Sequence, residues 1–294
     1  MSRINREGLP LTPHTIVITG ATSGIGRQAA LALGAQGHRL LVVGRNPDLL
    51  DALERDLRAR GAPSPTAFRA DLSLQSEVRR VAVEIAAAAP VIDVLVNNAG
   101  AIFDTRQLTA EGVERTVALN HVAYWLLTRA LLPNLCASAE GRIVNTASRA
   151  HLLGHLDFTD LQHARRYSGW EAYGASKLAN ICFTREVARR LSASASSRHV
   201  SASALHPGFV STRFGNANGP LFSAVIRIGK AILAISDERG ADTIVWLCTA
   251  PGAATRNGGY FAQRKPARLS VEAQDDEVAR RLWKVTAELV GEGE

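Results

Sequence analysis

A glycine-rich turn between an apolar run and a helical run constrains the fold of this chain more than any other sequence feature. Residues 14–19 form a β-branched run typical of a buried parallel strand, and Gly20, Gly24 and Gly26 follow before the helical run 27–36. Such a turn brings the backbone and a positive helix N-terminus close to a pyrophosphate group. The alternative is a turn without a ligand, because its spacing differs from GxGxxG. The pattern favours an α/β fold with a dinucleotide site.

Apolar runs and helical runs alternate through the rest of the 294 residues, without an internal repeat or a long linker. This order predicts an α/β, single-domain Rossmann-type fold over residues 1–294, a doubly wound sheet of about seven mostly parallel strands in the order 3-2-1-4-5-6-7, with helices on both faces. The predicted strands are 14–19, 39–43, 66–70, 91–96, 141–147, 200–205 and, at an edge, 259–262. The predicted helices are 27–36, 48–60, 75–89, 109–136, 173–192, 237–249 and 271–290.

Composition excludes several classes of protein. Three widely spaced cysteines indicate buried thiols in a reducing compartment, with no disulfide framework and no metal site. The polar N-terminus lacks a signal-peptide core and no apolar run is long enough for a membrane span, so we expect a cytoplasmic protein with no stable membrane anchor. The net charge of +7 comes from scattered arginine pairs. This pattern predicts no nucleic-acid binding, although the surplus charge would attract an anionic cofactor or substrate.

The end of the second predicted strand bears on cofactor choice. Arg45 stands where a fold specific for NAD carries an acidic residue against the ribose. Its guanidinium can pair with a 2′-phosphate, and no carboxylate is present there to repel one. The alternative is an ordinary surface arginine. We therefore expect NADP(H) rather than NAD(H).

Polar residues at the ends of the next strands have open interpretations. Asp71 can accept a hydrogen bond from an adenine amino group, or it can cap the helix that begins near Ser73. The run Asn97-Asn98-Ala99-Gly100 suits a sharp turn whose amides satisfy backbone groups that position a cofactor. Asn120 lies in mid-helix, which is unfavourable unless its side chain has a partner, so it is either a site residue or a core hydrogen-bonding group.

Tyr173 and Lys177 are four residues apart on a predicted helix and therefore share one face. A nearby cation lowers the pKa of a phenol, so this pair can exchange a proton with a carbonyl or an alcohol under mild conditions. Ser148 stands at the carboxyl end of the fifth strand, where open α/β sheets bind ligands. Alone, the Tyr and Lys spacing also occurs on many solvated helices.

Two further segments flank this predicted site. Residues 149–172 are expected to form a loop beside a substrate pocket, with His151, His155 and His163 structural rather than metal-binding. Thr212 can bond a carboxamide or cap the segment that follows it. Residues 212–236 are apolar and basic, and we expect a substrate lid there; the alternatives are a dimer contact or membrane-surface docking.

Taken together, these motifs resemble the single-domain branch of the short-chain dehydrogenase/reductase family. Three segments are more similar to the retinol dehydrogenase and WW-domain oxidoreductase group: Glu111-Gly-Val-Glu with Leu119-Asn120-His121, Ser176 to Thr184, and His206 to Val210. Ser148 precedes Tyr173 by 25 residues, where most relatives have about a dozen, and this longer spacing fits that group. Light-dependent protochlorophyllide reductases, which reduce a double bond, are also similar in outline.

The resemblance implies an NADP(H)-dependent oxidoreductase, with an EC 1.1.1 alcohol–carbonyl reaction. Tyr173 would be the general acid or base, Ser148 would bond the carbonyl oxygen, Lys177 would bond the nicotinamide ribose and lower the Tyr173 pKa, and Asn120 would hold a water. The implied cofactor-binding residues are Gly20, Thr22, Ser23, Gly24, Ile25, Gly26, Arg45, Asn46, Asp71, Leu72, Asn98, Ala99, Gly100, Tyr173, Lys177, Pro207, Gly208, Val210 and Thr212.

The substrate and the assembly are less constrained by the sequence. Apolar residues around 209–226 favour a lipophilic aldehyde, ketone or secondary alcohol, unless they belong to the core. Relatives commonly pair through the two helices that contain Asn120 and Tyr173, but the lid or the terminal helix could alter that pairing. The sequence therefore leaves the oligomeric state open, with a homodimer or a homotetramer as candidates. The competing function is a non-catalytic NADPH sensor or interaction protein on the same fold.

Overall fold

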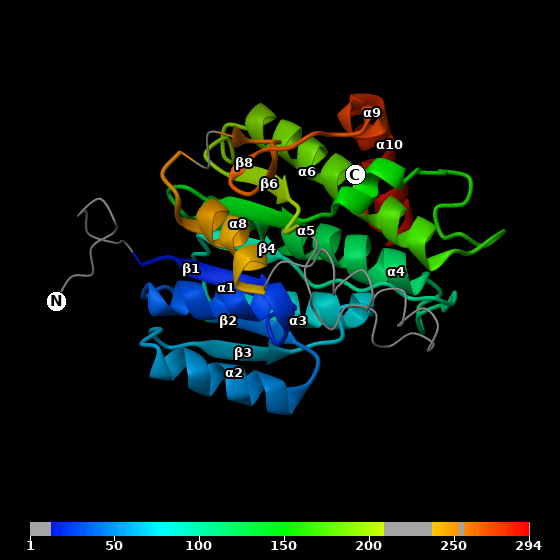
Figure 1. Ribbon diagram of the computed structural model, residues 1–294. Coiled ribbons are helices and arrows are strands. Elements are labelled where there is room, and N and C mark those ends of the chain that lie inside the picture. Colours follow the sequence, from blue (N-terminus) through cyan, green and yellow to red (C-terminus); the bar gives the residue numbers. More distant parts are fainter. Residues whose placement is uncertain (1–12, 209–236, 253–255, 294) are drawn as a thin grey trace.

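The computed structural model describes residues 13–208, 237–252 and 256–293, and within these ranges all eight strands belong to one sheet (Figure 1). The strand order is β3-β2-β1-β4-β5-β6-β7-β8. All pairs from β3 to β7 are parallel, and β7 pairs with β8 in the antiparallel sense. The strands are β1 Thr15–Thr19, β2 Arg39–Gly44, β3 Thr66–Arg69, β4 Val94–Asn97, β5 Arg142–Thr146, β6 Ser201–Leu205, β7 Tyr260–Ala262 and β8 Lys265–Pro266.

Helices cover both faces of the sheet, as the alternating apolar runs predicted. The central strands are buried on both sides: in β1, Val17 belongs to one apolar cluster while Ile16 and Ile18 belong to the other. The cluster around Val17 includes α3 Gln75–Ala88, α5 Ala123–Cys136, α6 Gly169–Ala193 and α10 Asp276–Leu289. The opposite cluster includes α1 Gly24–Ala35, α2 Pro47–Ala59 and α8 Asp237–Thr249. The predicted Rossmann-type order is thus confirmed.

The sheet has one strand more than predicted. β8 is only two residues long and follows a turn in which Gln263 and Arg264 adopt positive φ angles of 48° and 62°. Neither residue is typical of a left-handed turn, so the sequence carries no hairpin signal there. Because β8 lies outside β7, the predicted strand 259–262 is not at the edge of the sheet.

The predicted helix 109–136 was wrong over its first six residues and regular only in part. Gly112 has a φ of +79°, and Glu114 begins the helical segment by accepting bonds from the N–H groups of Thr116 and Val117. The segment then runs through α4 Arg115–Val117 and a π-helical turn, η1 Ala118–Val122, into α5. The π turn contains Asn120, and such turns occur often at functional sites.

The predicted terminal helix 271–290 is divided in two. Asp275 ends α9 Val271–Gln274 and caps α10 by accepting from the N–H group of Glu277 at 2.8 Å. Trp283 of α10 stacks on Phe183 of α6 and contacts Trp125 of α5, with ring centroids 6.0 and 5.5 Å apart. The chain itself therefore covers this surface of α5 and α6, the two helices expected to pair with a second copy.

Candidate active site

The glycine turn after β1 has a backbone that other groups approach closely, because its glycines have no side chains. Gly20 and Gly24 adopt positive φ angles of 64° and 53°. A Cβ at Gly26 would lie 2.4 Å from the Gly20 carbonyl oxygen and 2.4 Å from Asn98 Nδ2, so no side chain fits there. Helix α1 begins at Gly24 and its N-cap residue Ser23 makes no side-chain capping bond. The first N–H groups of α1 therefore fit a pyrophosphate, which they would bind together with the positive end of the helix.

The carboxyl ends of β2 and β3 lie side by side and bring Arg45 next to Asp71. Arg45 is 69% exposed at its side chain and lies 3.8 Å from an Asp71 carboxylate oxygen. The Asp71 pKa is lowered: burial acts to raise it, but bonds from the Ser73 hydroxyl and N–H group and the nearby Arg45 outweigh this. Asp71 thus caps a turn and not the helix, because α3 begins only at Gln75. Despite its long contact with Asp71, the exposed Arg45 guanidinium is accessible to an anion from solvent.

Two other residues predicted to bind the cofactor have local structural roles here. Asn46 accepts a bond from the N–H group of Leu49 at 3.0 Å and so caps α2. Leu72 is buried in the core on the α3 side of the sheet. Thr22, which was also predicted to bind the cofactor, packs against Gly44: a Cβ at Gly44 would lie 2.7 Å from the Thr22 methyl carbon. The ends of β1 and β2 are therefore in close contact at the predicted nucleotide site.

The Asn97 to Gly100 turn is tied to the end of β1 by Thr19. The Thr19 hydroxyl oxygen accepts from the N–H groups of Asn98 and Ala99 at 2.9 and 3.0 Å, and Asn98 Nδ2 donates to the Thr19 carbonyl oxygen at 3.0 Å. A Cβ at Gly20 would lie 2.8 Å from Ala99. Of the two asparagine amides, only that of Asn98 bonds the backbone, whereas Asn97 Nδ2 donates to the side chains of Thr128 and Asn145. Thr19 was not among the residues predicted to bind the cofactor, although its hydroxyl holds this turn.

Asn120 connects the π turn to the rest of the site through every part of its amide. Its Oδ1 accepts from the Ala101 N–H at 2.9 Å, and its Nδ2 donates to the Ala101 carbonyl oxygen at 2.9 Å and to Ser176 Oγ at 3.0 Å. Ser176 in turn donates to the Tyr173 carbonyl oxygen at 2.8 Å. Because only one Oδ1 lone pair is left over, the expected water would have at most one side-chain position at Asn120.

Tyr173, Lys177 and Ser148 lie together at the carboxyl ends of β4, β5 and β6. Lys177 Nζ is 5.6 Å from the centre of the Tyr173 ring and donates to the Thr146 carbonyl oxygen at 3.0 Å. The Tyr173 side chain hydrogen-bonds with that of Ser148. A Cβ at Gly100 would lie 3.1 Å from Asn120 Oδ1 and 3.2 Å from Lys177 Nζ. The four residues predicted to be catalytic are therefore connected by a series of contacts: Gly100 lies next to Asn120 and Lys177, Lys177 lies next to Tyr173, and Tyr173 bonds Ser148.

Burial dominates the ionisation of these groups. It raises the pKa of Tyr173 to about 12 against the opposing effect of the Ser148 bond, and it lowers the pKa of Lys177 to about 7. The expectation that Lys177 lowers the Tyr173 pKa is therefore not met in the protein alone. The physical reason is that Tyr173 and Lys177 are only 8% and 2% exposed, so both charged forms have lost their hydration.

A network of buried polar side chains lies next to this site and shares the Thr146 carbonyl oxygen with Lys177. Asn97 Nδ2 donates to Asn145, Asn145 Nδ2 donates to Thr184, and the Thr184 hydroxyl donates to the Asn180 carbonyl oxygen. Asn180 Nδ2 reaches the same Thr146 carbonyl oxygen that Lys177 holds. Sequence reasoning missed the network, although polar residues inside the runs 94–97 and 142–146 are a signal that strand interiors carry hydrogen bonds.

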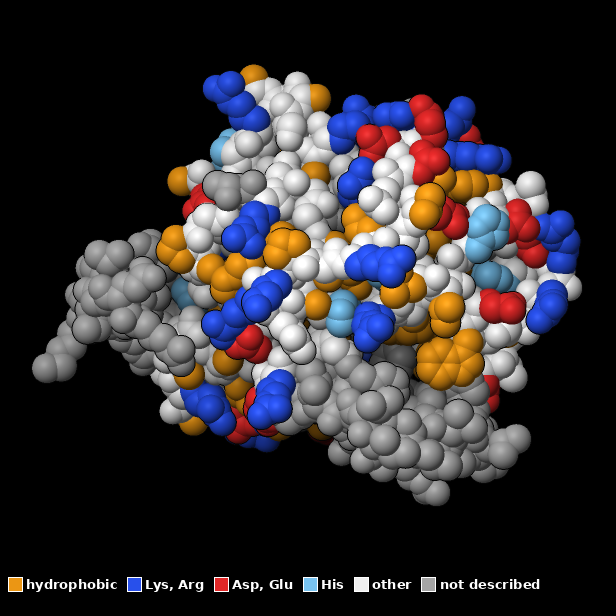
Figure 2. All heavy atoms as spheres, turned by 45° about the horizontal axis from the view of Figure 1, so that its top comes forward, with side chains coloured by type: hydrophobic (Ala, Val, Ile, Leu, Met, Phe, Trp, Pro, Cys, Tyr) orange, Lys and Arg blue, Asp and Glu red, His pale blue; other side chains and the backbone are white. Residues whose placement is uncertain are grey.

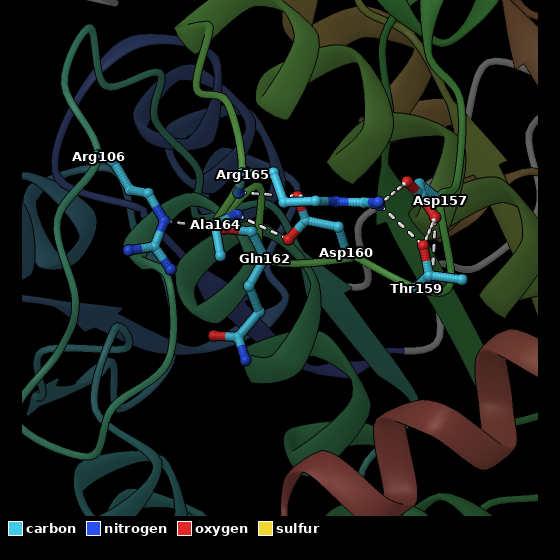
Figure 3. Close-up of polar contacts among 7 residues, drawn as sticks. All are labelled: Arg106, Asp157, Thr159, Asp160, Gln162, Ala164 and Arg165. Atoms are coloured by element: carbon cyan, nitrogen blue, oxygen red, sulfur yellow. Dashed lines mark hydrogen bonds and ion pairs between the residues drawn. The ribbon is translucent and has the colours of Figure 1, made fainter.

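The segment between Ser148 and Tyr173 is more ordered than the predicted loop. It begins with a 3₁₀ turn, η2 Arg149–Leu153, and its middle part, residues 157–165, is folded around the carboxylates of Asp157 and Asp160 (Figure 3). Asp160 accepts from the N–H groups of Ala164 and Arg165, and Arg165 bonds Asp157 and Thr159. Arg106 donates to the Gln162 carbonyl oxygen, which fixes the segment to the loop before α4.

The rings of His151 and His155 make hydrogen bonds, and the ring of His163 contacts that of Tyr167 edge to face. His151 is fully buried, and His155 contacts Glu272 at 3.0 Å. Within the described ranges, no group of His, Cys, Asp and Glu is placed to hold a metal ion. Among the described helices, none combines the length and the hydrophobicity of a membrane-spanning segment.

The turn that follows β6 contains the predicted cofactor-binding residues Pro207 and Gly208. Gly208 has a φ of +89° and donates its N–H to His206 Nδ1 at 3.0 Å, with Pro207 between them. Val210, Thr212 and the predicted lid 212–236 lie outside the described residues.

Helix α6 begins at Gly169, four residues before the predicted start, because Ser168 caps it.

The surface of the molecule shows no single basic field on the face that Figure 2 presents. Lysine and arginine side chains there are interspersed with acidic, apolar and histidine side chains. This is the distribution that the scattered arginine pairs of the sequence indicated.

Comparisons with known proteins agree with this geometry. A family model described as short chain dehydrogenase matches residues 14–220. A protein of Streptomyces sp. (strain C5) described as a daunorubicin C-13 ketoreductase is 40% identical over 98% of this chain and 97% of its own length. Retinol dehydrogenase 13 of Homo sapiens is 37% identical over 94% of this chain and 84% of its own.

A solved structure is also similar to this chain. A Beutenbergia cavernae protein described as an NAD(P) dependent gluconate 5-dehydrogenase, with bound NADP, is 32% identical, with a TM-score of 0.66 over 86% of this chain and 96% of its own. The family match and the relatives' coverage of nearly the whole sequence confirm the resemblance seen in the motifs. This chain belongs to the short chain dehydrogenase family and is similar to its retinol dehydrogenases.

Proposed function

We propose that the protein is an NADP(H)-dependent oxidoreductase that interconverts a lipophilic aldehyde or ketone and the corresponding alcohol. The observation that carries this proposal is the series of contacts that connects Asn120, Lys177, Tyr173 and Ser148. A buried phenol, a hydroxyl and an ammonium at one point serve proton transfer to a carbonyl oxygen. A nucleotide-binding module without a reaction has no use for such a set.

The roles of the protein groups follow from their chemistry. The nicotinamide supplies or accepts the hydride when it is bound. Tyr173 gives a proton to the carbonyl oxygen during reduction and removes it from the alcohol during oxidation. Ser148 donates a hydrogen bond to the same oxygen as negative charge develops on it. Since burial raises the pKa of Tyr173 to about 12, the phenol is protonated at neutral pH and ready for reduction.

The supporting groups act on the nicotinamide side of the site. Lys177 would bond the ribose hydroxyls, and its pKa of about 7 in the free protein allows it to gain full charge once these partners replace lost hydration. Asn120 holds Ala101 and Ser176 and so keeps the π turn against α6. The glycine turn and the start of α1 would hold the pyrophosphate.

NADP(H) is proposed over NAD(H) because of Arg45. Its exposed guanidinium has a long contact to Asp71 and is available to a 2′-phosphate. The bound NADP in the related Beutenbergia cavernae structure supports this choice. A lipophilic carbonyl substrate is supported by relatives whose names specify retinol and daunorubicin.

Turnover with a panel of carbonyl compounds and the Tyr173→Phe variant tests the proposal. The wild type should oxidise NADPH in the presence of lipophilic aldehydes or ketones. Tyr173→Phe should lower kcat by about 10²- to 10⁴-fold, the usual contribution of a general acid, and should leave NADPH binding unchanged. Full activity in that variant would disprove the role of Tyr173. Tight NADPH binding without turnover on any carbonyl would favour the sensor, and reduction of carbon double bonds alone would favour the reductase alternative.

A further inference from the structure

A buried histidine connects Ser148 to a segment more than a hundred residues later in the chain. His151 of η2 is 0% exposed, and its Nδ1 lies 2.7 Å from the Ser148 carbonyl oxygen. On the other side of the ring, the N–H group of Ser270 donates to His151 Nε2 at 3.3 Å. The Tyr260 hydroxyl lies 3.4 Å from Nδ1, and the two rings meet edge to face. The imidazole thus bridges Ser148 and the residue that precedes α9.

The partners of this ring determine its protonation. A carbonyl oxygen can only accept a hydrogen bond, and a backbone N–H group can only donate one. His151 must therefore carry a proton on Nδ1 and none on Nε2. Burial lowers the pKa of His151, with the bond to the Ser148 backbone opposing it, so the neutral ring is favoured. One neutral tautomer satisfies both partners at neutral pH.

A second set of contacts holds the same two segments together. Glu272 of α9 accepts from the Leu156 N–H group at 2.9 Å and contacts His155 Nδ1 at 3.0 Å. Nearby, a Cβ at Gly154 would lie 2.4 Å from the Gly174 carbonyl oxygen, so η2 ends directly against α6 next to Tyr173. A small shift of η2 would therefore change the position of Ser148 relative to Tyr173.

We propose that His151 is a positioning residue: by linking the Ser148 backbone to Ser270, it holds the Ser148 hydroxyl beside Tyr173. This inference rests on the proposed function, because it assigns a part in the same reaction. The segment from Ser270 to Glu272 is on this account part of the support of the active site, although it follows Ser148 by more than a hundred residues.

Substitutions at His151 separate positioning from folding. His151→Phe fills the space but removes both bonds, and kcat should fall by about 10- to 100-fold, as expected for a lost buried hydrogen bond, with NADPH affinity unchanged. His151→Asn keeps a donor toward the Ser148 carbonyl oxygen but loses the acceptor for the Ser270 N–H group, so it should recover only part of kcat. The control His199→Asn changes a partly buried histidine that bonds the Cys136 carbonyl oxygen, away from Ser148, and should leave kcat unchanged. Wild-type kcat in His151→Phe, or no recovery in His151→Asn, would overturn the proposal.

A pair of substitutions at Ser270 tests the link from its other end. Ser270 has a φ of −68°, which proline can adopt, so Ser270→Pro removes the N–H donor without changing the φ of residue 270. Ser270→Ala keeps the donor and removes only the hydroxyl that caps α9 through Ala273. Ser270→Pro should lower kcat severalfold more than Ser270→Ala. Equal kcat values in the two variants would contradict the link.

The tautomer of His151 provides a readout without turnover. Nitrogen-15 NMR of the imidazole should show a proton on Nδ1 and none on Nε2 at neutral pH. A proton on Nε2 would overturn the link and leave the proposed function intact. Conversely, a wild type without turnover on any carbonyl would disprove the proposed function, and with it the catalytic part of this inference.

Discussion

At the carboxyl ends of β1 to β3 the site is shaped by main chain, whereas at the carboxyl ends of β4 to β6 it is shaped by buried side chains. The first region, the dinucleotide edge, comprises residues 19–26, 44–46 and 69–72. It has glycines with no room for a Cβ and an exposed arginine. The second region, the reaction edge, comprises residues 97–100, 145–151 and 173–180. Its polar side chains bond one another out of contact with water.

The difference has a physical basis. A pyrophosphate is bound by N–H groups and a helix end, which any sequence provides if the backbone can come close enough. Proton transfer to a carbonyl needs particular side chains with shifted pKa values, and these shifts need burial. The dinucleotide edge therefore depends on the absence of side chains, and the reaction edge depends on the presence of specific ones.

The largest effect is expected from a methyl group at the dinucleotide edge. Gly26→Ala would place a Cβ 2.4 Å from the Gly20 carbonyl oxygen, so the turn must move. We expect NADPH binding to be lost and the free energy of unfolding to fall by about 1–3 kcal/mol, as for overpacked sites. Calorimetric titration and denaturant unfolding measure both. Gly293→Ala, where nothing lies within 4 Å, is the control and should be neutral. Normal NADPH binding by Gly26→Ala would refute the main-chain account.

The Lys177→Met variant tests whether the buried Lys177 at the reaction edge lowers the free energy of unfolding of the apo protein. Burial lowers the pKa of Lys177 from 10.5 to about 7, so between these values the unfolded chain holds a proton that the folded chain lacks. The contribution of Lys177 to the free energy of unfolding should then rise with pH across this window, and the burial penalty is present in full below it. Lys177→Met should abolish turnover, stabilise the apo protein most at pH 7 and below, and remove the rise.

Denaturant unfolding of the apo wild type and Lys177→Met from about pH 6 to about pH 10 measures this difference. Parallel stability curves for the two proteins would show that Lys177 keeps its ordinary pKa. In that case the reaction edge would be more hydrated than its buried side chains indicate.

Arg45→Ser should change cofactor choice at the dinucleotide edge without changing the chemistry. Loss of a charged partner of the 2′-phosphate should weaken NADPH binding by about 10- to 100-fold and leave NADH binding nearly unchanged. The control Arg55→Ser removes an exposed arginine from α2 and should affect neither. Titration of each variant with both cofactors gives the ratio. An unchanged ratio in Arg45→Ser would mean that Arg45 is only a surface residue.

The smallest effect is expected from Glu111, which caps α3 and lies outside both edges. Glu111 accepts from the N–H groups of Gln75 and Ser76 at 2.6 and 2.8 Å and so caps α3 from a distant loop. Burial acts to raise its pKa, but these bonds outweigh it and lower the pKa. Glu111→Ala should lower the free energy of unfolding by about 0.5–1 kcal/mol at neutral pH. The difference should vanish as acid protonates the carboxylate, because the stabilisation is lost as pH falls through the folded pKa.

Thermal unfolding of Glu111→Ala against Glu288→Ala, an exposed glutamate on α10, isolates the cap. Both variants should turn over substrate like the wild type. A loss of activity in Glu111→Ala would show that α3 affects the site more directly than its distance in the sequence indicates.

Local signals in the sequence were sufficient to predict most strands and helices of this protein and their order in the sheet. The β-branched run and glycines of 14–26 define a strand, a turn and a helix by steric restriction alone. The spacing of Tyr173 and Lys177 places them on one helix face in any fold. Alternating strands and helices then leave few topologies, because parallel crossovers are right-handed. The sheet order from β3 to β7 was therefore predictable, as was the edge at which Ser148 lies.

The tertiary structure decided what the side chains of the site touch. Asn120 lies in a π turn because Ala101 and Ser176 both bond its amide, and His151 has one tautomer because Ser148 and Ser270 flank it. The pKa of Tyr173 goes up, although its sequence neighbour Lys177 predicted the reverse. Burial and hydrogen bonds between distant segments depend on which elements meet. Residue spacing along the chain encodes the backbone of the site, and only packing sets its hydration and charge.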